Sequence, residues 1–253
     1  MAQGSGVALR AAGDALMDAI DLALYDACHE EGCPICRLRL AGERRYLLRL
    51  LSEFVNDAFV RERYIASLGF CPQHARQLQA LEQDRWGDGL GNAILCEDLL
   101  TRMLKALHQH RETWTHCSAP RGWRPRRSRI ALPHALTPRS LCRVCELGET
   151  LVARNSERLV RAAAEAGELW EAYADSTGLC WDHLRQALEY VSSDNSLAAV
   201  RLLDQSINRL QALTAALDSY VESHDYHHQG EVLSAEVRAS WLHAVAWLAG
   251  EEL

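Results

Sequence analysis

Apolar residues recur at three- and four-residue spacing along most of this chain, which is the period of an α-helix. The pattern first runs through residues 7–28, where aspartates occupy the opposite face, and it resumes at 34–51. It predicts further helices over about residues 58–67, 72–83, 92–109, 141–166, 168–175, 181–190, 196–221 and 232–248. The chain is therefore predicted to be all-α.

Local start and stop signals agree with these helices. Pro34 suits a first helical position, Asn56 or Asp57 can cap the helix that follows, and Gly69 can end it. The two long helices, near 92–109 and 196–221, are amphipathic, and we expect the two halves of the chain to pack through them. In the first of these, the residues expected to face inward are Ile94, Leu95, Leu99, Leu100, Met103, Leu104 and Leu107.

A four-residue set occurs twice in the chain. Its first copy consists of Cys33, Cys36, Cys71 and His74, and its second copy consists of Cys142, Cys145, Cys180 and His183. A constant shift of 109 residues maps one copy onto the other without a gap, and about 12 of the 42 spanned positions are identical. The sequence therefore predicts two tandem helical repeats, at residues 1–115 and 141–253, with a linker at 116–140.

Three cysteines and one histidine in two close pairs are the ligand set of a closed tetrahedral zinc site. Chance, or simple burial of cysteines, would not place both histidines at the same offset. We expect two zinc ions, one for each repeat, in structural sites with no open position for water. A redox-active dithiol pair is the alternative chemistry.

The spacing leaves open how the ligand pairs combine. Within one repeat, Cys33 and Cys36 would meet Cys71 and His74; in a swapped arrangement they would meet Cys180 and His183. The loop-closure entropies of the two arrangements differ by only about 1.2 kcal/mol. We favour pairing within each repeat, because the two helices between its ligand pairs could fold back as a hairpin.

Composition narrows the class of protein. The 253 residues are 48% apolar and contain only six prolines, which is typical of a soluble helical protein. The amino terminus lacks a signal-peptide pattern and no stretch is apolar enough to span a membrane, so we expect a cytoplasmic protein. In a reducing compartment the nine cysteines favour metal binding over disulfides. The net charge of −7 argues against a general polyanion binder.

The linker differs from the rest of the chain. It is rich in proline and arginine and carries no acidic residue; its arginines are Arg121, Arg124, Arg126, Arg127, Arg129 and Arg139. With Trp114 and Trp123 as stacking platforms, it could form an arm for nucleic acid. We favour a solvated connector that packs on the acidic remainder of the molecule.

A second concentration of metal-ligand residue types spans His224, Asp225, Tyr226, His227 and His228. It could serve an enzyme with a pocket between the repeats, but the sequence holds none of the catalytic motifs of hydrolases, zinc proteases or dinucleotide enzymes. We expect an interaction or regulatory protein whose partner is another protein. A zinc-thiolate sensor of oxidation or metal stress is the second hypothesis.

Several short motifs of the first half resemble those of a known protein family. They are the first copy, its Asn56-Asp57 pair and the runs Gly69-Phe70-Cys71-Pro72-Gln73-His74, Asp88-Gly89-Leu90-Gly91 and Glu97-Asp98-Leu99-Leu100. The chain resembles a family of uncharacterised bacterial proteins with the same duplicated cysteine and histidine pattern. The resemblance covers most of the chain and implies a bacterial cytoplasmic source and a shared site for the four ligands of the first copy. The second copy departs from the pattern, with Arg143 in place of Pro34 and Trp181 in place of Pro72.

Overall fold

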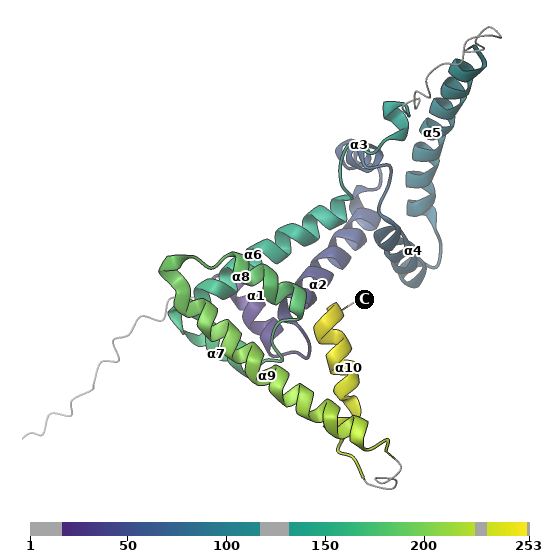
Figure 1. Ribbon diagram of the computed structural model, residues 1–253. Coiled ribbons are helices and arrows are strands. Elements are labelled where there is room, and N and C mark those ends of the chain that lie inside the picture. Colours follow the sequence, from purple (N-terminus) through teal and green to yellow (C-terminus); the bar gives the residue numbers. More distant parts are fainter. Residues whose placement is uncertain (1–16, 117–131, 226–231, 252–253) are drawn as a thin grey trace, which may run out of the picture.

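A computed structural model describes residues 17–116, 132–225 and 232–251, which form helices joined by turns (Figure 1). The first half contains α1 (Ala19–Cys28), α2 (Pro34–Arg49) with its π-helical extension η1 (Leu50–Phe54), α3 (Ala58–Ala66), α4 (Pro72–Trp86) and α5 (Leu90–His116). The second half contains η2 (His134–Leu136), α6 (Arg143–Glu165), α7 (Glu168–Asp175), α8 (Trp181–Glu189), η3 (Ser193–Asn195), α9 (Ser196–Glu222) and α10 (Ala235–Ala249). These described residues contain no strand, so the all-α prediction is confirmed.

The duplication is visible in the helices as well as in the sequence. The shift of 109 residues carries α2 with η1 onto α6, α3 onto α7, α4 onto α8 and α5 onto α9, with ends that agree within a few residues except at α4, which is longer than α8. Helix α10 has no such counterpart within the described ranges. The predicted repeat is thus a real supersecondary unit. The domain boundaries at 115 and 140 stay a prediction, because most of the linker (117–131) lies outside the described residues.

Side chains and glycines set the helix ends. Helix α1 begins at Ala19 because Asp18 accepts hydrogen bonds from the backbone N–H groups of Ile20 and Asp21; the predicted earlier start at residue 7 lies outside the described ranges. The turns before α4 and α8 contain Gly69 and Gly178, with φ of 91° and 86°. Glycine adopts this left-handed conformation without steric cost, which lets the chain turn sharply into each Cys-x-x-His helix.

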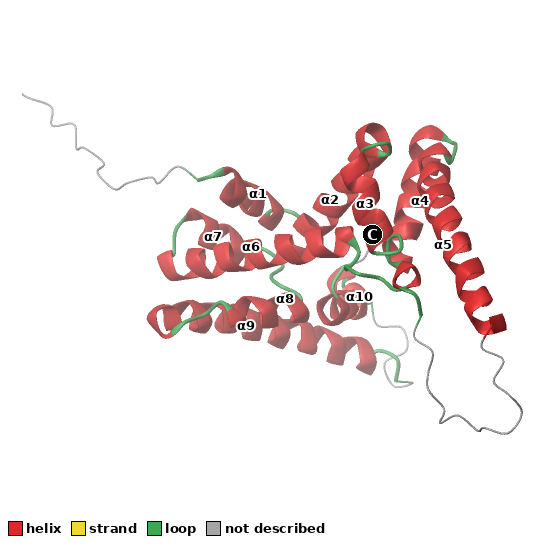
Figure 2. Cartoon of the chain, turned by 90° about the horizontal axis from the view of Figure 1, so that it is seen from above, coloured by secondary structure: helices red, strands yellow, loops and turns green. Residues whose placement is uncertain are grey.

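Helices α2 and α6 form the centre of the molecule and run in opposite directions (Figures 1 and 2). Ile35, at the start of α2, shares an apolar core with Leu159 near the end of α6. Leu47, at the end of α2, shares a second core with Val144 at the start of α6. The two cores therefore lie at opposite ends of one antiparallel helix pair, and each contains residues from both halves of the chain.

An internal two-fold relation accounts for this pairing. Gly42 and Leu151 are equivalent positions under the shift of 109, and they face each other across the helix pair: a Cβ added at Gly42 would collide with Cδ1 of Leu151. A position that contacts its own equivalent lies near an axis of symmetry. The two repeats thus pack around an approximate two-fold axis that passes between α2 and α6.

The expectation that α5 and α9 join the halves is wrong. These two helices lie at opposite ends of the molecule, and α2 and α6 make the contact between the halves instead (Figures 1 and 2). Three residues of α5 that were expected to face inward are exposed: Leu100, Leu104 and Leu107. Helix α9 packs on α6 and α10, and α10 returns the chain to the start of α2. Among the described helices, none has the length and apolar character that crossing a membrane requires.

Candidate metal centres

All eight candidate ligands gather into two clusters. The first cluster consists of Cys33, Cys36, Cys180 and His183, and the second cluster consists of Cys71, His74, Cys142 and Cys145. In each cluster the four ligand atoms lie within 4.8 Å of one another. Each cluster takes one ligand pair from each half of the chain. That these residues bind metal stays a prediction, whereas their convergence is a property of the fold.

Helix N-termini position every ligand. The first residue of each pair is the N-cap of a helix and the second is the third residue of that helix, at the starts of α2, α4, α6 and α8. One turn of helix therefore aims both side chains at the same point. Two helix N-termini converge on each cluster, and their partial positive charges favour anionic sulfur ligands.

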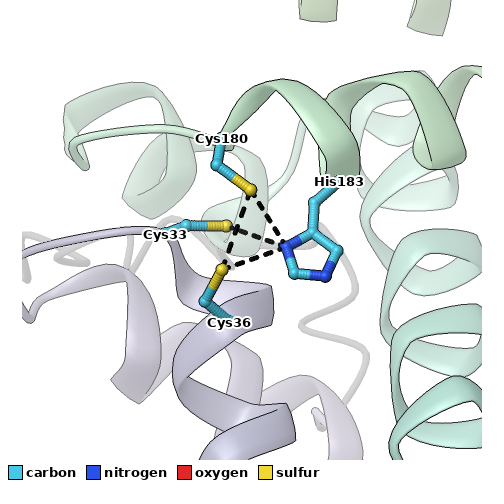
Figure 3. Close-up of side chains that lie close together, drawn as sticks. All are labelled: Cys33, Cys36, Cys180 and His183. Atoms are coloured by element: carbon cyan, nitrogen blue, oxygen red, sulfur yellow. Dashed lines mark hydrogen bonds between the residues drawn. The ribbon is translucent and has the colours of Figure 1, made fainter. Parts of the chain in front are cut away.

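The four side chains of the first cluster point toward one another (Figure 3), and all four residues are buried. The Nδ1 atom of His183 lies 3.4 Å from Sγ of Cys33 and 3.2 Å from Sγ of both Cys36 and Cys180. The sulfurs of Cys36 and Cys180 are 3.7 Å apart. All four residues are buried, so little solvent reaches the ligand atoms.

The end of α10 covers this first cluster. Glu251 accepts a hydrogen bond from the Cys33 backbone N–H at 2.8 Å, and its own N–H lies 3.5 Å from the Cys36 sulfur. A Cβ added at Gly250 would touch the sulfurs of Cys36 and Cys180 at 3.4 and 3.7 Å. No local pattern predicts this contact, because Glu251 is more than 200 residues away from its partners in the chain.

The second cluster has the same arrangement but is more open. Its histidine, His74, places Nδ1 3.1 Å from the Cys71 sulfur, 3.6 Å from that of Cys142 and 3.4 Å from that of Cys145. The sulfurs of Cys71 and Cys145 are 3.7 Å apart. Cys71 and Cys145 are only partly buried, so this cluster is the more accessible of the two.

The separations match those that zinc requires. With Zn–S near 2.3 Å and Zn–N near 2.0 Å, a regular tetrahedron puts sulfurs about 3.8 Å apart and sulfur and nitrogen about 3.5 Å apart. The observed sulfur–sulfur distances of 3.7 Å and sulfur–nitrogen distances of 3.1–3.6 Å agree with both values. A disulfide would need about 2.05 Å between sulfurs. The donor set therefore fits a four-coordinate ion with no open position.

Electrostatics also favour a cation at each cluster. Burial raises the pKa of Cys33, and the neighbouring sulfurs raise it further. Burial also acts on Cys142, but the hydrogen bond to His74 and nearby backbone N–H groups lower its pKa to about 6. Burial raises the pKa of Cys145 to about 12. Without a cation the three sulfurs of a cluster cannot all ionise, whereas a divalent ion would stabilise all three thiolates.

Pairing within each repeat is wrong for this structure, which has the swapped arrangement. The reason is helix length. Helix α2 with η1 spans 16 and 5 residues, or about 32 Å at 1.5 Å per residue, whereas α3 spans 9 residues, or about 14 Å. Helix α3 therefore covers less than half of the distance from the end of η1 back to the start of α2, which disfavours pairing within the repeat. The second repeat has the same mismatch, with 23 residues in α6 against 8 in α7.

The other candidate residues separate into those that the structure describes and those outside it. Most of them lie outside the described residues: Arg121, Trp123, Arg124, Arg126, Arg127 and Arg129 of the linker, and Tyr226, His227 and His228. Arg139 is described, and its backbone N–H donates to the carbonyl oxygen of Ala66 at 2.7 Å. His224 is exposed at the end of α9, where its Nδ1 lies 2.8 Å from the carbonyl oxygen of Tyr220. The nucleic-acid and enzyme hypotheses therefore stay untested predictions.

The fold and the clusters define an all-α protein, duplicated internally, with two Cys3His sets that could each hold a metal ion. Residues 17–251 match the family described as "Family of unknown function (DUF6062)", and the chain belongs to that family. It is also 26% identical, over 223 residues, to a protein from Caldicellulosiruptor sp. (strain Rt8B.4) described as "Uncharacterized 23.9 kDa protein in xynA 3'region". That match covers 88% of this chain and 97% of the relative. No solved structure matches the chain.

Proposed function

We propose that this protein is a zinc-stabilised helical interaction protein, in which two zinc ions hold the two repeats together. The observation that carries the proposal is the pair of four-residue Cys3His clusters, each with two ligands from either half. Four protein ligands at tetrahedral separations are typical of structural zinc, since a catalytic site keeps one position for water or substrate. Each ion would act as a crosslink between the repeats.

Zinc binding would then supply much of the folding free energy. Structural zinc sites have apparent binding free energies of about 10–16 kcal/mol at neutral pH, and a site that forms only in the folded state transfers this to stability. We expect purified protein to contain two zinc ions per chain and to lose helicity when a strong chelator removes them. X-ray absorption should show three sulfurs and one nitrogen around each ion. Oxygen-rich first shells, or full helicity after complete metal removal, would contradict the proposal.

The interaction part of the proposal rests on an uncovered face of α9. Its positions 200, 203, 207, 210, 214, 217 and 221 alternate three- and four-residue spacing, as in the contact stripe of a coiled coil. Val200, Leu203 and Ile207 in this stripe are 51%, 41% and 49% exposed. Asp204 and Asp218 are exposed beside it. The chemistry fits another protein that presents an amphipathic helix with basic residues flanking its apolar stripe.

A designed peptide can test this surface. The probe is a helix with leucine at the contact positions and lysine beside them, and its control carries glutamate in place of lysine. We expect the zinc-loaded protein to bind the lysine peptide, and an Ile207→Ser variant to lose that binding. Leu248→Ser, at a similarly exposed residue of α10, is the matched control and should bind normally. Equal binding of both peptides, or no effect of Ile207→Ser, would refute this surface.

A redox sensor is the second candidate, and one observation favours it. The second cluster has two partly buried cysteines, Cys71 and Cys145, with sulfurs 3.7 Å apart. Peroxide could oxidise these two thiolates to a disulfide, with two protons taken up and two water molecules formed, and the cluster would release its ion. A sensor requires zinc release by mild peroxide before unfolding, and recovery with reductant and zinc. Release only upon unfolding would eliminate this candidate.

A cytoplasmic location also remains part of the proposal. It is supported by the six reduced cysteines of the two clusters, since thiolate ligands persist in a reducing compartment.

A further inference from the structure

Helix α2 carries a buried carboxylate that the zinc ligand set does not use. Glu43 is 2% exposed, and its Oε2 atom lies 3.5 Å from Nε2 of His74. Both atoms are shielded from solvent, and neither has a hydrogen-bond partner at shorter range. Burial of an isolated carboxylate is strongly unfavourable, so a glutamate at this position needs a partner. Among the described residues, the imidazole of His74 is the only side chain within ion-pair distance of this Oε2 atom.

The imidazole is oriented so that its two nitrogens have different roles. Nδ1 of His74 points to the three sulfurs of the second cluster, and Nε2 points away from them to Glu43. If Nδ1 binds a metal ion, Nε2 carries the ring proton and must donate it. Glu43 is in position to accept that proton in a hydrogen bond. A carboxylate behind a metal-bound histidine fixes the orientation of the ring and strengthens its binding to the metal.

The neighbouring helix makes room for this carboxylate. Oε1 of Glu43 lies against Gly148 of α6, and a Cβ added at Gly148 would collide with it. Nη1 of Arg39 lies 3.9 Å from the same oxygen, one helical turn before Glu43. A glycine in a helix interior destabilises the helix relative to alanine, so its presence here needs a packing reason. The position of Glu43 supplies that reason.

Within the described ranges, the first cluster has no equivalent of this carboxylate. Under the shift of 109 residues, Glu43 corresponds to Val152 and Gly148 corresponds to Arg39. Val152 is buried in the same apolar core as Cys36 and Cys180 of the first cluster. Among the residues that the structure describes, the duplication therefore retained both ligand sets but placed a carboxylate behind only one of the two histidines.

We propose that Glu43 is a positioning residue of the second cluster, which accepts the Nε2 proton of His74 and thereby holds Nδ1 on the metal ion. This inference rests on the proposed function, because it requires that the cluster binds zinc. Its consequence is that the two zinc sites differ: only the second depends on a buried carboxylate. Loss of such a partner typically lowers metal affinity by about 10–100-fold.

The test measures the zinc affinities of the full-length protein by competition with a chromophoric chelator. In Glu43→Leu we expect one of the two affinities to fall about 10–100-fold and the other to stay unchanged. Cysteine alkylation assigns the weakened site, and Cys71 and Cys145 should become reactive while Cys33 and Cys180 stay protected. Glu43→Gln should recover part of the loss, since its amide oxygen can still accept the proton. Glu53→Gln, at an exposed glutamate in η1, is the matched control.

Two further measurements separate positioning from simple packing. Gly148→Ala leaves Glu43 in the chain but displaces its carboxylate, so it should weaken the same site, and it serves as the test should Glu43→Leu fail to fold. NMR of the zinc-loaded protein should show a hydrogen-bonded Nε2 proton on His74 that is lost in Glu43→Leu. Unchanged affinities in both Glu43→Leu and Gly148→Ala, or equal losses at the two sites, would overturn the proposal. A wild-type protein that binds no zinc would instead overturn the proposed function.

Discussion

A double variant that exchanges two facing residues at the centre of the molecule should lose far less stability than the sum of the losses in the two single variants. Gly42 of α2 and Leu151 of α6 are equivalent positions of the two repeats, and they face each other where the approximate two-fold axis passes. Gly42 has no side chain where the side chain of Leu151 fills the space opposite it. The paired variant, with Gly42→Leu and Leu151→Gly, places the leucine on the other side of the same axis.

The expected sizes follow from the local packing. Gly42→Leu forces four carbon atoms into space that Leu151 fills, and overpacking of this kind costs about 1–3 kcal/mol even after the gain in helix propensity. Leu151→Gly leaves a cavity and puts a glycine inside a helix, and should cost about 3 kcal/mol. Because each change relieves the defect of the other, we expect the pair to recover at least about 1.5 kcal/mol relative to the sum.

Urea unfolding of the zinc-loaded protein, followed by circular dichroism, measures these differences. Gly89→Ala is the control, since a Cβ at Gly89 meets no atom within 4 Å and should leave stability nearly unchanged. If the stability losses of the two single variants simply add up in the double variant, the two positions do not contact each other. The antiparallel pairing of α2 and α6 around a two-fold axis would then be wrong.

Two other contacts give simpler expectations. Arg209 donates hydrogen bonds to three carbonyl groups at the end of α7, so Arg209→Met should lower the free energy of unfolding by about 3 kcal/mol in the same urea assay. The control Arg185→Met removes only an exposed ion pair and should change the free energy of unfolding little. Glu251→Ala removes the acceptor of the Cys33 N–H and should speed zinc transfer from the first cluster to a chelator; an unchanged rate would show that the end of α10 does not protect that cluster.

The sequence predicted what depends on local patterns. The three- and four-residue period located the helices, and the spacing of cysteines and histidines selected the eight residues that converge. Of the two predicted caps, Asn56 and Asp57, it is Asp57 that caps α3. Each of these properties is encoded within a few turns of one helix. They are independent of how the halves of the chain pack.

The pairing of ligands depends on longer distances and was predicted incorrectly. Loop entropy separates the two arrangements by only about 1.2 kcal/mol, which packing easily outweighs. The predicted helices at 34–51 and 58–67 differ in length, which disfavours a hairpin that closes on itself, and a comparison of those lengths would have favoured the swapped form.

Contacts between distant residues had no local signal at all. The pairing of Glu43 with His74 and the exposure of Leu100, Leu104 and Leu107 both depend on which helix packs against which. Periodicity marks a face as apolar, but it does not say whether the same chain covers that face.

Cysteine alkylation in full-length, zinc-loaded variants distinguishes the swapped pairing of the ligands from pairing within each repeat. Cys71→Ser breaks the second cluster, so Cys142 and Cys145 should react faster with iodoacetamide while Cys33 and Cys36 stay protected. Pairing within each repeat would give the opposite result, with Cys33 and Cys36 reactive and Cys142 and Cys145 protected. Mass spectrometry of the labelled peptides distinguishes the two patterns, and the second would contradict this account.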